Sequence, residues 1–290
     1  MKDENFGTVD DLDPRVASEL GYIGNTPAWI CAANNRFSYY LYVSQDYYKL
    51  KSLNLMVLIH SSSRNAPELR KQFVSIADEI PCIILAPLFP LELDDPYNSG
   101  GYKLLKYDGV RCDQILLSMV EEVSARYRRL EVERFFLFGF SGGGQFVHRF
   151  AYLYPQRLRA VACGAPGSQT LPDVTLPYPE GVKDLEQIFG LEMQWLELCS
   201  VPVFFIVGDA DTDTFYAMAR GRIVDPTQHG RYGITVRLEN AWRVAGANCY
   251  LHVVPGAAHQ EALMLGPVIS FFIQWQKFER NEYNSKVVGI

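Results

Sequence analysis

Short apolar runs of strand length recur along the chain, and segments with helical spacing of apolar residues separate them. The runs are Leu53–His60, Cys82–Ala86, Arg134–Gly139, Leu158–Cys163, Val201–Val207 and Cys249–Val254. Continuous apolar runs are typical of strands buried on both faces, as in parallel sheets. Between them, Pro67–Ile80, Asp108–Arg128 and Gly142–Tyr154 have the pattern of helices. This alternation predicts an α/β fold with a mostly parallel central sheet and helices on both faces.

The chain has 290 residues, a length that one large α/β domain can account for. We assign 36–280 to this domain and 281–290 to a C-terminal tail. We assign 1–35 to an N-terminal arm. Its first residues are predicted to be solvated and loosely held, because they include several acids: Asp3, Glu4, Asp10, Asp11 and Asp13. Residues 165–183 are rich in Pro, Gly, Ser and Thr, which indicates an irregular excursion, and a predicted helix at Leu185–Leu198 follows.

Charge and hydropathy restrict the partners and the compartment. The formal net charge is −6 and no basic stripe is present, so we expect neither a nucleic-acid partner nor a membrane-surface partner. The first 30 residues lack the pattern of a secretory signal. No apolar run approaches the roughly 18 residues that span a bilayer. We therefore expect a soluble, cytoplasmic protein.

The six cysteines do not indicate a metal site. None forms a Cys-x-x-Cys pair, and none has a histidine at ligand spacing. Cysteines in predicted strands usually behave as small buried apolar residues. We therefore predict reduced thiols, no metal and no cofactor.

The sequence Gly139-Phe140-Ser141-Gly142-Gly143 lies between a predicted strand and a predicted helix. A turn this sharp needs neighbours without a bulky Cβ, and it lifts the serine hydroxyl above the sheet edge. It also places the Gly142 N–H at a helix N-terminus, where negative charge is stabilised. Ser141 is therefore the candidate nucleophile. The alternative is a glycine-rich turn with an incidental serine.

A serine hydroxyl needs a general base to act as a nucleophile. The five histidines are His60, His148, His229, His252 and His259. His148 lies within the helix after Ser141, His252 lies within the last predicted strand, and His229 lies in a polar loop. His259 follows the last strand in a loop and is the candidate base, because chemistry in such sheets gathers at the carboxyl ends of strands.

The base in turn needs a carboxylate that orients it. The strand Val201–Val207 runs into Gly208-Asp209-Ala210-Asp211-Thr212-Asp213. Asp211 is the first choice from its spacing after the strand. Asp209 and Asp213 remain alternatives, although Asp209 can cap the turn and Asp213 the following helix.

Together these motifs resemble those of the α/β-hydrolase-fold serine hydrolases over roughly residues 35–280. The order Ser141, Asp211, His259 is the order found in that family. The continuation Ser141-Gly142-Gly143-Gly144-Gln145-Phe146 is similar to the esterases of the polyhydroxybutyrate-depolymerase-like or feruloyl-esterase-like branch.

The resemblance implies an oxyanion hole with two backbone donors. Gly142 matches the donor after the nucleophile, and Ser62 matches the donor from an early loop, with Ser61 as the alternative. This loop, His60-Ser61-Ser62-Ser63, departs from the family because Ser61 replaces the usual glycine. His60 is predicted to be a structural hydrogen-bonding residue. For the nearby Arg64, a solvated surface charge is preferred over a contact with an acidic substrate group.

The resemblance further implies hydrolysis of a carboxylic ester or lactone of small to medium size. A peptidase or amidase, a lyase or acyltransferase, and a non-catalytic binding protein remain alternatives on the same scaffold. The excursion 165–199 lies where that family has its cap, and because it is short the resemblance implies a modest lid. The pocket wall is expected from Leu88–Tyr107, 165–199 and Asp213–Trp242, with Phe89, Tyr97 and Tyr102 in the first. The partner is a small-molecule substrate. A homodimer stays open, because the aromatic helix Glu261–Glu279 can pack in the core or pair subunits.

Overall fold

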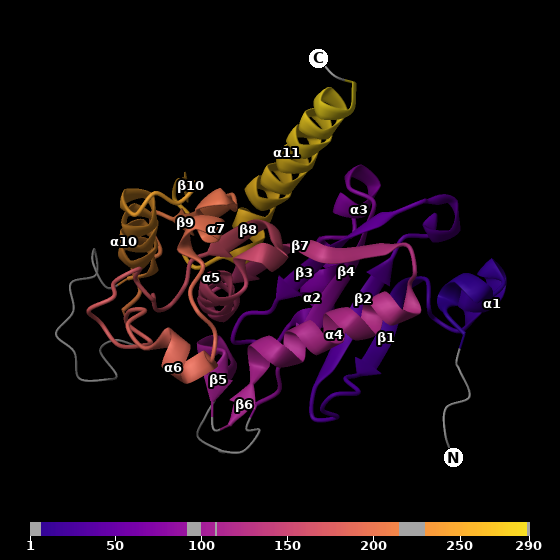
Figure 1. The fold of residues 1–290 in the computed structure, drawn as a ribbon, viewed down its shortest axis with the longest axis horizontal. Helices are drawn as coiled ribbons and strands as arrows, with labels where there is room; N and C mark the ends of the chain where they lie inside the picture. The colour runs from indigo at the N-terminus through magenta and orange to yellow at the C-terminus, as the bar shows by residue number, and fades with distance from the viewer. Residues whose placement is uncertain (1–6, 92–99, 108, 215–229, 289–290) are drawn as a thin grey trace. The chain divides into compact units, whose positions relative to one another are not determined.

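The computed structural model describes residues 7–91, 100–107, 109–214 and 230–288. These residues belong to two compact units, Met1–Phe136 and Leu137–Ile290. The strand order of the main sheet is β1-β2-β4-β3-β7-β8-β9-β10 (Figure 1), and β7 (Leu130–Phe140) crosses the boundary between the units. A small second sheet pairs β5 (Lys106–Tyr107) with β6 (Val110–Arg111). The predicted α/β class with a mostly parallel sheet is confirmed.

In the first unit, β3 (Leu53–Ile59) is buried at every position and pairs in parallel with β4 (Cys82–Leu88). β2 (Ser38–Val43) is antiparallel to β4, and β1 (Gly24–Ile30) is antiparallel to β2. The strand β4 extends beyond the predicted run Cys82–Ala86, because pairing with β2 continues with Pro87 opposite Tyr39 and Leu88 opposite Ser38.

Helical segments of the first unit are short apart from α4 (Cys112–Arg126). The single helix predicted for Pro67–Ile80 is two helices, α2 (Ala66–Gln72) and α3 (Ile76–Glu79), since tight turns at 73–77 interrupt it. The others are α1 (Pro14–Glu19) and the 3₁₀ turns η1 (Val9–Asp11), η2 (Tyr47–Lys49) and η3 (Gly101–Leu104).

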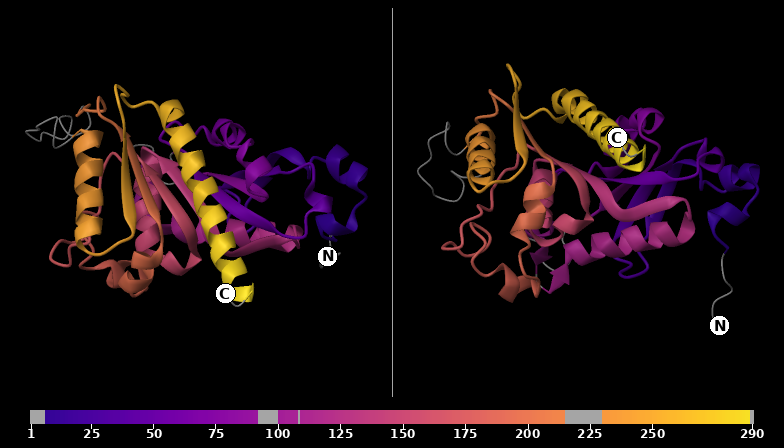
Figure 2. Two further views of the ribbon diagram at one scale, coloured as in Figure 1. Left: turned by 90° about the horizontal axis from the view of Figure 1, so that it is seen from above. Right: turned by 45° about the horizontal axis from the view of Figure 1, so that its top comes forward.

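In the second unit, β8 (Leu158–Gly164), β9 (Val203–Gly208) and β10 (Cys249–Val254) run parallel. The helix α5 (Gly142–Leu153) packs on β8, and the turn η4 (Pro155–Arg157) joins them. Figure 2 shows α10 (Arg231–Val244) and α11 (Glu261–Val288) on opposite faces of β9 and β10. Helices therefore cover both faces of this part of the sheet.

Two helical predictions in the second unit need correction. The helix predicted for Leu185–Leu198 is two short ones, α6 (Leu185–Phe189) and α7 (Trp195–Ser200), because Gly190 adopts a left-handed φ of 70° that ends α6. The last helix continues from Glu261 to Val288 instead of ending at Glu279. In the described part of the chain, no helix combines the length and the hydropathy needed to cross a bilayer.

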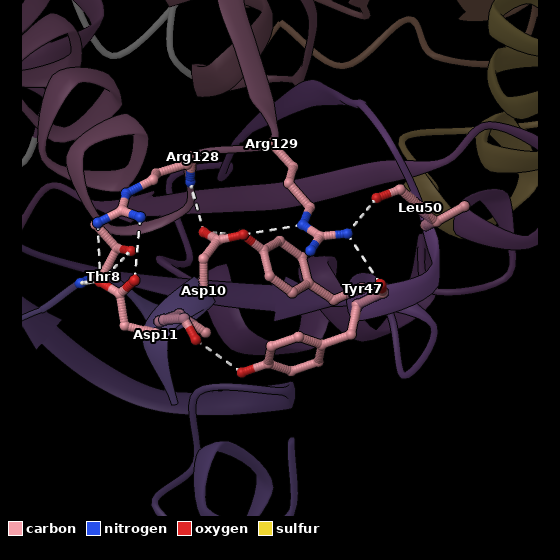
Figure 3. A network of polar contacts seen from close by, with 9 residues as sticks. Thr8, Asp10, Asp11, Tyr47, Leu50, Arg128 and Arg129 are labelled. Atoms are coloured by element: carbon pink, nitrogen blue, oxygen red, sulfur yellow. Dashed lines mark hydrogen bonds and ion pairs between the residues drawn. The ribbon is translucent and has the colours of Figure 1, made fainter. Parts of the chain in front are cut away.

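The N-terminal segment is not a loosely held arm where the structure describes it. Asp10 accepts hydrogen bonds from the Tyr47 hydroxyl at 2.6 Å and from Arg129 Nε at 2.9 Å. Asp11 forms two bonds with the Arg128 guanidinium (Figure 3). Asp13 caps α1. Farther along, Gly24–Ile30 form β1, a strand that the sequence did not predict. Asp3 and Glu4 lie outside the described residues.

Substitution of Asp10 by Asn is expected to destabilise the protein. Burial raises the pKa of Asp10, but hydrogen bonds from Tyr47, Arg129 and the Arg128 N–H outweigh it and lower this pKa overall. Hydrogen bonds to a charged group contribute about 1.5–3 kcal/mol, so we expect a loss of about 2 kcal/mol in urea unfolding at pH 7.

The pH dependence of this difference provides the check. A lowered folded-state pKa stabilises the protein above the unfolded-state pKa, and the contribution is lost as the pH falls through the folded-state pKa. The difference between wild type and Asp10→Asn should therefore shrink in acid. Asp46→Asn is the control, since Asp46 pairs with Lys49 on the surface, where both side chains are largely exposed. An equal loss in both variants would contradict the prediction.

Candidate active site

Ser141 lies at the junction of β7 and α5 in a backbone conformation that is rare outside glycine. Its φ is 56° and its ψ is −109°. Its N–H donates to the Gly164 carbonyl at 2.8 Å. A Cβ on Gly139 would overlap the backbone of Gly143, and a Cβ on Gly144 would lie 2.5 Å from the Gly164 oxygen. Gly139 and Gly144 are therefore required by close backbone contact.

The structure brings Ser141, His259 and Asp211 together. His259 Nε2 lies 3.0 Å from Ser141 Oγ, and His259 Nδ1 lies 2.6 Å from Asp211 Oδ2. The Phe140 ring stacks on the imidazole at a centroid distance of 4.7 Å. Asp211 follows β9 and His259 follows β10, so both come from loops at the carboxyl ends of neighbouring parallel strands.

The loops that carry Asp211 and His259 are bonded to each other. The Ala210 N–H donates to the Ala257 carbonyl at 3.0 Å, and the Gly256 N–H donates to Asp209 Oδ1 at 2.7 Å. A Cβ on Gly208 would overlap the Ala257 carbonyl, so only glycine permits this approach. Asp209 therefore fixes the histidine loop and does not contact the imidazole.

Asp211 and His259 differ strongly in exposure, and Asp211 has a cation nearby. The Asp211 side chain is 0% exposed and that of His259 is 29% exposed. Asp211 Oδ1 accepts no hydrogen bond from the residues that the structure describes, but Arg231 Nη1 lies 3.7 Å from it and equally 3.7 Å from Asp213 Oδ2. Sequence reasoning missed Arg231, because it belongs to no motif. Its position at the start of a helix after the acid loop was the only available signal.

Two other histidines are buried in structural roles. His60 Nδ1 donates to the Ser61 carbonyl, and its Nε2 accepts from the Phe89 N–H. His148 repeats this arrangement with the Gly144 carbonyl and the Thr170 N–H. Burial lowers the pKa of His60 to about 4 and that of His148 well below its usual value. Both rings are therefore neutral, and both nitrogens of each are occupied.

The remaining histidines do not join Ser141. His252 is exposed and its ring lies against Phe204. His229 lies outside the described residues, as do Tyr97 and the other parts of the expected pocket wall at 92–99 and 215–229. No cluster of three or more metal-ligating side chains occurs within the described ranges. Burial raises the pKa of Cys82 and of Cys112 to about 12, which keeps both thiols protonated.

The two predicted oxyanion donors belong to different units. Gly142 is the first residue of α5, where an N–H has no acceptor within the helix. In the first unit, Ser61–Arg64 form a turn closed by the Arg64 N–H and the Ser61 carbonyl at 3.2 Å. The Ser62 N–H has no acceptor among the residues the structure describes. Ser62 as the second donor stays a prediction.

Arg64 is not the solvated surface charge that the sequence favoured. Its Nη1 donates to the Ser62 carbonyl at 2.7 Å and its Nε to the Phe89 carbonyl at 3.2 Å. Its guanidinium also lies 5.5 Å from the centre of the Tyr102 ring. Arg64 therefore ties the serine-rich loop to the segment after β4.

Comparison with known proteins identifies the fold. No protein-family model matches the sequence, and a search of curated proteins gives no match. Among solved structures, the chain is similar to poly(3-hydroxybutyrate) depolymerase from Bordetella parapertussis, with 24% identity and a TM-score of 0.69 over 90% of this chain and 95% of that one.

Two further solved structures are similar to this chain over most of its length. Poly(aspartic acid) hydrolase-1 from Sphingomonas sp. KT-1 has 21% identity and a TM-score of 0.69 over 85% of this chain and 97% of that one. A siderophore hydrolase from Aspergillus nidulans has 15% identity and a TM-score of 0.58 over 86% and 94%. The chain therefore has the α/β-hydrolase fold, as its motifs predicted.

Proposed function

We propose that this protein is a serine hydrolase that cleaves a carboxylic ester or lactone of small to medium size. The observation that carries the proposal is the continuous contact from Asp211 through His259 to the Ser141 hydroxyl. Several structures with the same fold are named as a depolymerase, a ferulic acid esterase or a siderophore hydrolase. The depolymerase and the ferulic acid esterase support ester chemistry, whereas the similar poly(aspartic acid) hydrolase acts on a polyamide and keeps the amidase as the alternative.

In the first step Ser141 Oγ attacks the substrate carbonyl carbon while His259 Nε2 accepts the serine proton. Asp211 holds the imidazole through Nδ1 and stabilises its charged form. The backbone N–H of Gly142 and that of Ser62 bind the oxyanion. Collapse of the tetrahedral intermediate breaks the bond to the leaving group, which takes the proton from His259, and leaves the acyl group on Ser141.

In the second step water attacks the acyl group and His259 accepts a proton from it. The new tetrahedral intermediate collapses to the free acid, and His259 returns the proton to Ser141. No step uses a metal or a cofactor.

Substitution of Ser141 by Ala should abolish both labelling by a fluorophosphonate probe and turnover of p-nitrophenyl esters. The expected loss in kcat is about a million-fold, since the other members of a triad contribute little without the nucleophile. Circular dichroism should show an unchanged fold. The exposed Ser200→Ala is the control and should keep wild-type labelling. Turnover that persists in Ser141→Ala would exclude Ser141 as the nucleophile.

The same series distinguishes the leaving groups. Wild type is assayed with p-nitrophenyl esters beside the matching p-nitroanilides. Turnover confined to the esters supports the proposal. Preference for the anilides would replace it with the amidase alternative, and labelling without turnover of either series would favour an acyltransferase or lyase.

The three acids after β9 should have very different kinetic effects. Asp211→Asn should lower kcat about 10⁴-fold, because an amide cannot hold the required imidazole tautomer. Asp209→Asn keeps an acceptor for the Gly256 N–H and should cost about tenfold or less. Asp213→Asn should be similarly mild, since Asp213 touches Arg231 and not the imidazole. A larger loss in either variant than in Asp211→Asn would move the acid to that position.

The second oxyanion donor can be tested by removing one N–H group. Ser62→Pro deletes the predicted donor, and proline is favoured at this second position of a turn. We expect kcat to fall about 100–1,000-fold. Ser62→Ala keeps the N–H and should remain close to wild type. Full activity in Ser62→Pro would exclude Ser62 and leave Ser61 as the candidate.

A further inference from the structure

We propose that Arg231 is a positioning residue of the triad, whose guanidinium offsets part of the charge on Asp211 and so limits how tightly His259 holds a proton. The kinetic consequence of this role rests on the proposed function, whereas the effect of Arg231 on the His259 imidazole does not. The residue lies outside every sequence motif of the site.

The first observation concerns the second oxygen of Asp211. Oδ2 is bonded to His259, but Oδ1 is buried and accepts no hydrogen bond in the described residues. An ionised carboxylate that is 0% exposed needs compensation for the water it has lost. Arg231 Nη1, 3.7 Å from Oδ1, supplies opposite charge at this oxygen.

The second observation is how Arg231 is held there. It is the first residue of α10 and only 8% exposed. The next residue anchors the helix to the acid, since the Tyr232 N–H donates to the Asp211 carbonyl at 2.9 Å. The Thr235 hydroxyl donates to the Arg231 carbonyl at 2.7 Å. These bonds fix the start of α10 against the acid loop and so place the Arg231 guanidinium near Asp211.

The third observation is that Arg231 is shared. It lies 3.7 Å from Asp213 Oδ2 as well, and the Asp213 side chain is 59% exposed. Among the described residues, Asp211 binds the imidazole, Asp209 binds the Gly256 N–H of the histidine loop, and Asp211 and Asp213 both lie at Arg231. Arg231 thus places a positive charge beside the carboxylate that binds the ring.

The direction of the effect follows from charge. A nearby carboxylate favours the protonated imidazole, and a nearby guanidinium opposes it. Removal of Arg231 should therefore raise the pKa of His259, and more of the base would be protonated at neutral pH. Removal of Asp213 takes away a negative charge and frees Arg231 for Asp211, so it should lower the same pKa.

The test is an NMR titration of the His259 ring in the full-length chain, with the resonance assigned by its loss in His259→Gln. We expect Arg231→Met to move the titration of the ring to higher pH. Arg231→Lys should stay close to wild type, and Asp213→Asn should shift the pKa downward. Arg243→Met is the matched control on the same helix, because Arg243 is exposed and pairs with Glu239, and it should cause no shift.

Kinetics separate this role from a merely structural one. The acidic limb of kcat/KM for a p-nitrophenyl ester should move with the NMR pKa in each variant, whereas a structural defect would lower the rate without moving the limb. An unchanged His259 pKa in both Arg231→Met and Asp213→Asn overturns the inference. If Arg231→Met does not fold, the exposed Asp213→Asn decides. If wild type hydrolyses no ester, the proposed function fails while the titration still decides this inference.

Discussion

The backbone conformation of Ser141 is the constraint on which the site depends. A positive φ in a non-glycine residue costs of order 1–3 kcal/mol and persists only where the surroundings enforce it. Here Gly139 and Gly144 allow backbone contacts that any side chain would prevent, and the Gly164 carbonyl binds the Ser141 N–H. The end of β7, the end of β8 and the start of α5 therefore meet at one point. The buried strands and the nearly fully buried α5 stabilise this strained junction.

Features set by local residue patterns could be predicted from the sequence, whereas contacts between distant residues could not. Continuous apolar runs identify β3, β8 and β9 because burial on both faces is a local property of the residues. The strand β1 was missed because it contains Gly24, polar residues and Pro27. The bond of Asp10 to Arg129 was missed because it joins residues 119 positions apart, which no local pattern contains. Gly190 ended α6 by its backbone conformation, although the flanking residues have helical spacing.

Three histidines show why a site needs geometry beyond motifs. His60 and His148 each use Nδ1 for a carbonyl and Nε2 for a backbone N–H, so neither ring can accept a further proton without losing a bond. His259 has a carboxylate at Nδ1 and a hydroxyl at Nε2. A carboxylate stabilises the protonated ring, and a hydroxyl can give it the proton. The sequence placed His259 after a strand, but only its hydrogen-bond partners distinguish it from the two buried structural rings.

The three acids of the loop after β9 each have a separate contact. Asp209, Asp211 and Asp213 were alternatives for one role, because each follows β9 at a plausible spacing. In the structure each has a different contact: Asp209 binds the Gly256 N–H, Asp211 binds His259, and Asp213 lies at Arg231. Asp209 fixes the loop that carries His259, and Asp213 shares Arg231 with Asp211. Because Arg231 is shared between two carboxylates, its compensation of Asp211 is partial, and Asp211 retains negative charge for the imidazole. The surroundings of His259 therefore include the whole acid loop and the start of α10, as well as Asp211 and Ser141.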